Sequence, residues 1–165
     1  MSAHPLLAHY LRVAYGCMAC DGDIDPSEVS CLRSIAVQMG QPVAEVDATL
    51  ASIRQEFAKD SRDMVERAWS QLQTTGLQHG DALLLLDMLV QLVEADGEIR
   101  PNETQFVRDL VHSLALDRAR LREEHPEWRP YLAEILRPGP DASWAKALAG
   151  DFGELPEITL EKPSK

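Results

Sequence analysis

The chain has 165 residues, a formal net charge of −11 and a sequence pI of about 4.8, and 45% of its residues are hydrophobic. So negative a charge argues against a nucleic-acid backbone as partner, because that contact needs a basic surface that releases counterions. A cation or a basic protein surface fits better, and the apolar content is that of a globular protein rather than a disordered one.

The sequence shows no sign of export or of membrane insertion. It does not open with a basic segment followed by an apolar stretch and a cleavage site, so we expect no signal peptide. The longest apolar stretch, residues 82–93, is interrupted by Asp87 and Gln91 and is too short to span a bilayer. Three cysteines do not form a secreted disulfide framework. We therefore expect a cytoplasmic protein without direct membrane insertion.

Helix signals recur along the chain and predict an all-α fold. Prolines stand just ahead of several apolar patterns of helical spacing, where the missing N–H costs nothing. In chain order, helices are predicted at about 5–20, from Asp25 to Gly40, at 42–59, from Ser61 to before Gly76, at 81–95 and at 101–115, then in a seventh element capped by Asp117 and at 127–137. The helix at 81–95 is apolar almost all round, which predicts the most enclosed element. No alternating pattern indicates a sheet.

A repeated motif divides the predicted helices into two similar halves. Residues 20–28 read C-D-G-D-I-D-P-S-E and residues 95–103 read A-D-G-E-I-R-P-N-E, with an offset of 75 residues. Apolar positions on both sides match at the same offset. Each half is thus predicted to be helix, acidic loop, helix, and we expect a compact bundle of about seven to eight helices with an internal twofold repeat. Helices 5–20 and 81–95 would be central partners.

One interpretation of the two loops is purely structural. The Gly allows a sharp turn, the Ile enters the core and the Pro restarts a helix. Glu28 and Glu103 then follow a presumed helix cap by three residues and reach back to a free backbone N–H. Asp25 suits the capping role, whereas its counterpart Arg100 does not.

The other interpretation is a shared divalent-metal site. The pattern D-G-x-I-x-x-x-E is the second half of an EF-hand loop, whose final Glu binds Ca²⁺, but the first half is missing. One loop alone supplies too few oxygen ligands, whereas two loops brought together by the twofold would pool their carboxylates. Such carboxylates repel one another, and a divalent cation, Ca²⁺ or Mg²⁺ in preference to Zn²⁺, would relieve the repulsion. The candidate ligands are Asp21, Asp23, Asp25, Glu28, Glu94, Asp96, Glu98 and Glu103.

With its two acidic loops between helices, the chain resembles the TerB-like tellurite-resistance domain family over about residues 5–125, and is similar to the N-terminal domain of the co-chaperone DjlA. The resemblance implies a seven-helix bundle with an acidic, metal-binding patch at Asp21, Glu28, Asp96 and Glu103. It also implies a role in metal or chemical stress responses within multi-protein, often membrane-associated assemblies, and no established catalytic activity. Cys20 stands where the family usually has Ala.

Other features are weaker. Cys17 and Cys20 form a C-x-x-C pair that either fills the core or binds a soft metal or undergoes oxidation. Asp87, Gln91 and Glu94 form a polar row expected to face the acidic loops or to pair with arginines. No nucleophile stands beside a plausible base in a known catalytic motif, so we expect no enzyme.

We therefore predict a helical binding domain over residues 1–137 and a C-terminal extension over 138–165 that is partly disordered or docks as an arm. The binding domain would hold a cation and a protein partner. The rival hypothesis is a metal-free adaptor, whose loops are only turns and whose partner docks in an apolar groove or on residues 144–155. A metal-dependent hydrolase that uses the same carboxylates is a third hypothesis.

Overall fold

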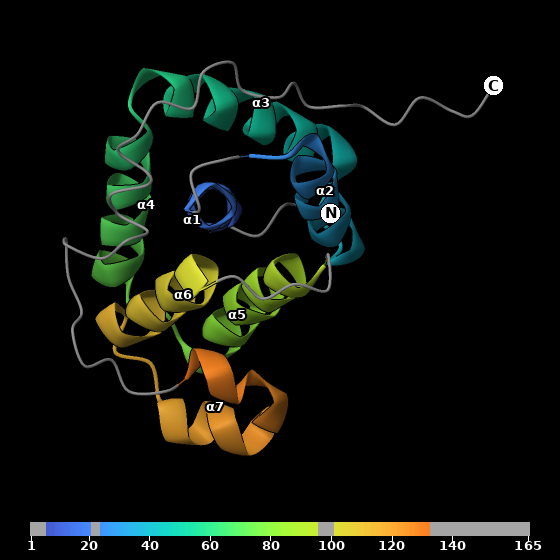
Figure 1. Ribbon diagram of the computed structural model, residues 1–165. Coiled ribbons are helices and arrows are strands. Elements are labelled where there is room, and N and C mark those ends of the chain that lie inside the picture. The colour runs from blue at the N-terminus through green and yellow to red at the C-terminus, as the bar shows by residue number, and fades with distance from the viewer. Residues whose placement is uncertain (1–5, 21–23, 96–100, 133–165) are drawn as a thin grey trace.

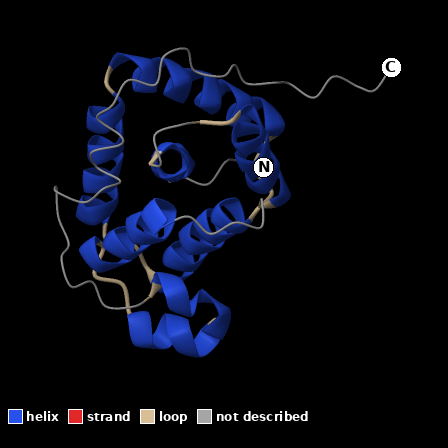
Figure 2. Ribbon diagram, in the orientation of Figure 1, coloured by secondary structure: helices blue, strands red, loops and turns tan. Residues whose placement is uncertain are grey.

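The computed structural model describes residues 6–20, 24–95 and 101–132, and within these ranges the ordered elements are all helices (Figures 1 and 2). They are α1 (Leu7–Ala19), α2 (Pro26–Gln38), α3 (Val43–Lys59), α4 (Ser61–Thr75), α5 (His79–Glu94), α6 (Pro101–Ser113), α7 (Arg118–Glu124) and the 3-10 helix η1 (Pro126–Tyr131). The predicted all-α class is confirmed. The domain division at residue 137 stays a prediction, because it falls outside the described residues.

Aspartate caps fix the starts of three helices. In each case a carboxylate accepts a hydrogen bond from a backbone N–H of the first turn, which the helix itself leaves without a partner. The three caps are Asp25 on the N–H of Ser27 (2.9 Å), Asp60 on that of Asp63 (3.0 Å) and Asp117 on that of Arg120 (3.1 Å). Such a cap is worth about 1 kcal/mol. The predicted starts after Asp25, near Ser61 and at Asp117 are thus explained by local chemistry.

Helix α1 lies at the centre of the bundle. Figure 1 shows it end-on, inside a ring formed by α2, α3, α4, α5 and α6, and it contacts all five. Ten of its thirteen residues are buried. Most of the hydrophobic core therefore forms around this helix.

The prediction that the fifth helix is the most enclosed was wrong. Of the sixteen residues of α5, eight are buried, while Leu83 and Leu84 are only partly covered and Asp87 and Gln91 are exposed. Helix α5 does contact α1, as expected of central partners, but it belongs to the surrounding ring. The approximate twofold relation between the two halves stays a prediction.

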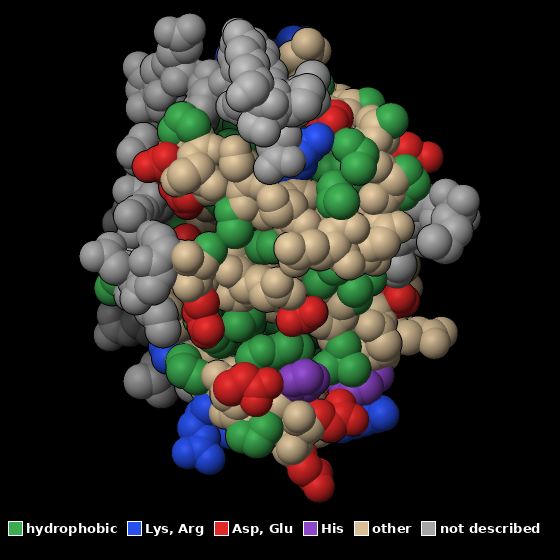
Figure 3. Space-filling view, turned by 90° about the vertical axis from the view of Figure 1, so that its right-hand side faces the viewer, with side chains coloured by type: hydrophobic (Ala, Val, Ile, Leu, Met, Phe, Trp, Pro, Cys, Tyr) green, Lys and Arg blue, Asp and Glu red, His purple; other side chains and the backbone are tan. Residues whose placement is uncertain are grey.

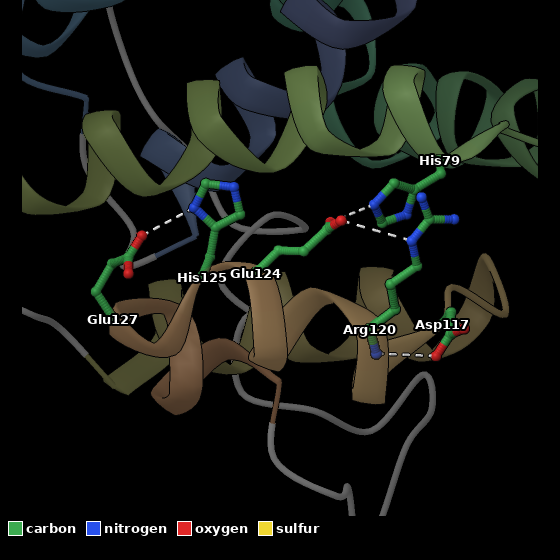
Figure 4. A network of polar contacts seen from close by, with 6 residues as sticks. All are labelled: His79, Asp117, Arg120, Glu124, His125 and Glu127. Atoms are coloured by element: carbon green, nitrogen blue, oxygen red, sulfur yellow. Dashed lines mark hydrogen bonds and ion pairs between the residues drawn. The ribbon is translucent and has the colours of Figure 1, made fainter.

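Helix α7 and η1 lie outside the ring, and η1 packs against α6 (Figure 1). Figure 4 shows the polar contact that attaches α7 to the start of α5, in which His79 contacts the carboxylate of Glu124. Within α7, Nε of Arg120 lies 3.6 Å from the same carboxylate. The hydrogen bond with His79 lowers the pKa of Glu124. The next residue, His125, stacks on Trp128 with ring centroids 3.9 Å apart. The helical pattern predicted at 127–137 thus begins as a 3-10 helix, and its last residues lie outside the described ranges.

Candidate functional site where the acidic loops end

The described ends of the two acidic loops are joined by a hydrogen bond. The side-chain amide of Asn102, in the first turn of α6, donates to the backbone carbonyl of Cys20 at 2.8 Å. Cys20 is the last residue before Asp21, and Asn102 comes just after Pro101, where the second loop ends. The chain entering the first loop therefore lies against the chain leaving the second, although the two positions are 82 residues apart in the sequence.

Four of the eight candidate ligands lie outside the described residues. They are Asp21, Asp23, Asp96 and Glu98, which stand with Gly22 and Gly97 in the central parts of the loops. The other four, Asp25, Glu28, Glu94 and Glu103, flank those central parts and have defined environments.

Asp25 and Glu28 form a complete capping box at the start of α2. One carboxylate oxygen of Asp25 accepts hydrogen bonds from the backbone N–H of Ser27 at 2.9 Å and from its hydroxyl at 2.8 Å. In return, Glu28 accepts the backbone N–H of Asp25 at 3.1 Å. The structural interpretation of the first loop is therefore correct for these two residues, whose mutual hydrogen bonds account for their positions.

Glu103 has a different environment from its counterpart Glu28. It lies in the first turn of α6 and is only 5% exposed, whereas Glu28 is half-buried. A carboxylate in a buried position is costly unless hydrogen bonds, positive charge or a cation offset the lost hydration. The N-terminal end of α6 offsets part of this cost through the helix dipole, which favours a negative charge there.

Cys17 links the environments of Glu28 and Glu103. Its thiol is fully buried, and its pKa is raised well above the usual range by a hydrogen bond with Cys20, by burial and by the negative charges of Glu103 and Glu28. The Cys17 thiol is thus close enough to both glutamates that follow the acidic loops for their charges to raise its pKa. The raised pKa keeps the thiol protonated, whereas nucleophilic attack and zinc binding both need the thiolate. Core filling is therefore the better interpretation of the C-x-x-C pair.

Glu94, the last residue of α5, lies at the entrance to the second loop and accepts a hydrogen bond from the Tyr131 hydroxyl at 3.0 Å. Its own side chain is exposed, whereas Tyr131 in η1 is 1% exposed. Burial, the hydrogen bond to Glu94 and the charges of Glu94, Cys17 and Glu103 all raise the pKa of Tyr131. The end of η1 therefore lies in the same region as Cys17 and Glu103.

The arginine partners expected for the polar row of α5 are engaged elsewhere. Arg12 is bound to Glu56 at 2.8 Å and Arg33 to Asp47 at 2.6 Å, which ties α1 and α2 to α3. Among the described residues, no positively charged side chain forms an ion pair with Glu94. Its partner is the phenol of Tyr131.

Sequence reasoning missed Asn102 and Tyr131. Asn102 stands where the first motif has Ser27, so nothing in the repeat distinguishes it from an ordinary first-turn residue. Tyr131 has the spacing of a core aromatic, which it also is, and its hydroxyl contact spans 37 residues. Neither contact follows from local spacing.

The oxygen donors present match the preference of a hard cation such as Ca²⁺ or Mg²⁺. The carboxylates of Glu28, Glu94 and Glu103 lie around the joined loop ends. Within the three described ranges, however, no group of three or more His, Cys, Asp or Glu side chains is arranged closely enough to hold a metal ion. A complete site would thus require carboxylates from the central parts of the loops.

Two hollows lie away from the loop ends. One, of about 260 Å³, lies between α1, α3 and α4 and is lined by His9, Arg12, Glu56 and Arg67 together with Met64, Ala68 and Gln71. The other, of about 150 Å³, lies between the start of α5 and α7. Charged side chains help to line both hollows, Arg12 and Glu56 in the first and Asp117 and Arg120 in the second. Apolar side chains on the face shown in Figure 3 are interspersed with polar ones. Among the described residues Val43, 45% exposed, is the one large hydrophobic residue that is not at least partly buried.

The chain matches a known protein family. The model of the family described as tellurite resistance protein TerB matches residues 8–124. No curated protein and no solved structure matches the chain. None of the helices in the described ranges has the length and apolar character needed to cross a membrane. The family match ends at the last residue of α7, so η1 lies beyond it.

Proposed function

The chain belongs to the TerB tellurite-resistance family, and from this membership we propose that it is a non-catalytic binding domain whose two acidic loops jointly hold a divalent cation. The cation is Ca²⁺ or Mg²⁺ in preference to Zn²⁺, because the candidate ligands are all carboxylates. A protein partner docks nearby, and the domain acts in a cytoplasmic response to metal or chemical stress of the tellurite type. Nucleic acid and direct membrane insertion have no part in it.

The hydrogen bond from Asn102 to the carbonyl of Cys20 carries the proposal. A shared site needs the two loops to leave the helices next to each other, and this contact holds the end of one loop against the start of the other. Were the loop ends on opposite faces, eight carboxylates could not serve one cation.

Electrostatics supports a cation at this place. A chain with a net charge of −11 gathers Glu28 and Glu103 around one buried thiol, with Glu94 close by. Clustered carboxylates raise one another's pKa and destabilise the fold unless a positive charge relieves them. A bound divalent cation supplies that charge and crosslinks the two loops.

Melting temperature in the presence of Ca²⁺, Mg²⁺, Mn²⁺ and Zn²⁺ tests the proposal. A cation at about 100 times its Kd stabilises the folded state by about 2.7 kcal/mol, which for a chain of this size raises the Tm by about 5–10 °C. Replacing Asp21→Asn together with Asp96→Asn should abolish the shift. A matched control is Glu45→Gln with Glu123→Gln, which makes the same change in charge at exposed positions of α3 and α7 and should leave the shift unchanged.

The capping box favours a second candidate function, a metal-free adaptor or co-chaperone-type interaction domain whose loops are only turns. Asp25 and Glu28 satisfy each other's backbone without any ion. Under this alternative none of the four cations shifts the Tm at millimolar concentration. Turnover of phosphoesters that depends on Asp21 and Asp96 would instead revive the hydrolase hypothesis.

A further inference from the structure

We propose that the hollow between α1, α3 and α4 binds a small oxyanion, a molecule with a carboxylate or phosphate group, through Arg12 and Arg67. The hollow has a volume of about 260 Å³, and all the residues that line it belong to these three helices. The inference does not depend on the acidic loops or on the proposed cation. It assigns a second ligand site to the domain.

The two arginines that line the hollow have unused N–H groups. A guanidinium carries five N–H donors. Arg12 directs Nε and Nη2 to one oxygen of Glu56, at 3.2 and 2.8 Å, and Arg67 directs Nε to Asp63 at 2.9 Å. Nη1 of Arg12 and both Nη atoms of Arg67 have no partner among the described residues. These donors are available to an oxyanion, whose geometry a guanidinium matches.

His9 adds a group whose protonation would respond to a bound anion. It lines the hollow from α1, and its Nδ1 is buried without a hydrogen-bond partner among the described residues. Burial and the charge of Arg12 lower the pKa of His9, although Glu56 lines the same hollow. The ring therefore lies in a positive potential. An anion would reduce that potential and raise the pKa of His9.

The size and charge of the hollow favour a compact ligand. Its volume is roughly nine times the share of one water molecule in the liquid. Pockets for drug-sized ligands are larger, at about 300–1,000 Å³. With His9 neutral, two arginines against one glutamate give the lining a net charge of +1, whereas the whole chain carries −11. A small anion therefore fits this site, and a nucleic acid or another polyanion does not.

Glu56 competes with such a ligand. Its carboxylate holds Arg12 at 2.8 Å, and the two side chains are 31% and 22% exposed. An oxyanion would be attracted to the same guanidinium and repelled by the carboxylate. Replacing Glu56 by Gln should therefore strengthen binding, whereas replacing an arginine should weaken it. A hollow without a ligand gives no reason for these opposite effects.

NMR titration of the full chain with sulfate, and separately with malonate, tests the site at an ionic strength kept constant with NaCl. Sulfate represents a phosphate group and malonate a carboxylate. The His9 ring signals, assigned by their loss in His9→Gln, should shift and saturate with a Kd on the order of 1 mM. At saturation the pKa of His9 should be higher than without the anion. The ring signals of His112, exposed in the last turn of α6, should not shift.

Arg67→Gln should weaken the Kd by about 3–10-fold, because it removes charge-assisted hydrogen bonds at a position that is 69% exposed. The matched control is Arg62→Gln. Arg62 also lies in α4 and pairs through Nε at 2.9 Å with a carboxylate one turn away, that of Glu66, but it does not line the hollow. This control should change the Kd by less than about 2-fold, since salt screens its charge.

Glu56→Gln should tighten the Kd by about 2–5-fold, which corresponds to the strength of a partly exposed ion pair. Glu66→Gln removes the same charge outside the hollow and should leave the Kd unchanged. The test does not require Glu56→Gln to fold, because Arg67 is a surface residue whose replacement leaves the core intact.

Saturable binding of either anion supports the site, and the anion that binds more tightly identifies the preferred group. His9 signals that shift no more than those of His112 would overturn the inference. Equal Kd values for Arg67→Gln and Arg62→Gln, or weaker binding by a folded Glu56→Gln variant, would also overturn it. The proposed function is tested with cations and stands or falls separately.

Discussion

Gly16 of α1 lies so close to Val65 of α4 that a β-carbon on Gly16 would be 2.6 Å from one Val65 methyl and 3.0 Å from the other. Real β-carbons almost never come this near another heavy atom. The valine side chain is branched and stiff, so it cannot turn away easily. This missing side chain allows α4 to pack directly onto the central helix.

Gly16→Ala should therefore destabilise the protein. Overpacking costs roughly 1–3 kcal/mol, and the better helix propensity of Ala offsets about 1 kcal/mol of it. In a Val65→Ala background the methyl groups are gone, and the same substitution should become stabilising by up to about 1 kcal/mol. Free energies of urea unfolding measure both effects. Gly80→Ala, with nothing within 4 Å, is the control and should stabilise in either background. Equal destabilisation by Gly16→Ala with and without Val65 would contradict the close-packing argument.

Asn102→Ala should destabilise the protein by about 1–3 kcal/mol, because it leaves the carbonyl of buried Cys20 without its side-chain donor. Gln73→Ala is a matched control, since Gln73 also donates from a side-chain amide to a helix carbonyl, that of Ser113, but at an exposed position and 3.2 Å. Gln73→Ala should lower the free energy of unfolding by less than about 0.5 kcal/mol. Chemical denaturation measures both. Equal effects of the two variants would show that the contact between the loop ends contributes no more than a surface hydrogen bond.

The helices could be predicted because their start and stop signals are local. Asp25, Asp60 and Asp117 cap their own helices, and Gly40 and Gly76 adopt positive φ values of 90° and 70° where α2 and α4 end. The identity of the central helix could not be predicted in this way. Counting apolar residues favoured α5, yet α1 is the helix that contacts all five ring helices, and Gly16 lets α4 pack directly onto it, a property that composition does not reveal.

The site could be predicted only in part, for the same reason. The repeated Asp-Gly motif drew attention to the loops, and the capping role of Asp25 and Glu28 follows from their spacing. The contact of Asn102 with Cys20 and that of Tyr131 with Glu94 join residues 82 and 37 positions apart. Such contacts depend on how whole helices pack, and one sequence contains no local signal for them.

Cysteine reactivity should differ sharply within the chain. Cys17 and Cys20 have no exposed surface and burial helps raise the pKa of Cys17, whereas Cys31 is partly exposed. At pH 8 a thiol reagent such as iodoacetamide should modify Cys31 first, and the other two only when the protein unfolds. Mass spectrometry after timed alkylation locates the modified residues, and Cys31→Ser should leave no rapidly reacting thiol. Rapid labelling of Cys17 in the native protein would restore the redox interpretation of the C-x-x-C pair.

His9 should make the stability of the fold depend on pH. Nδ1 of His9 is buried without a hydrogen-bond partner among the described residues, and burial, with the nearby charge of Arg12, lowers its pKa below 6.5. Glu56 and Arg67 line the same hollow from α3 and α4. The unfolded chain therefore binds a proton more readily than the folded one. The stability that the fold gains from a neutral His9 is fully present above about pH 6.5. It is lost as the pH falls through the lowered pKa of His9 in the folded state.

The free energy of unfolding should consequently decrease as the pH is lowered from 7.5 to 5. His9→Gln should make this decrease smaller. This window lies above the one in which Glu124 protonates, since its pKa is lowered from 4.5. The control is His112→Gln, at an exposed position in the last turn of α6, and it should retain the slope. NMR titration of the His9 ring gives the folded-state pKa directly. A value above 6.5, or an unchanged slope in His9→Gln, would show that the hollow between α1, α3 and α4 accepts the charged imidazole.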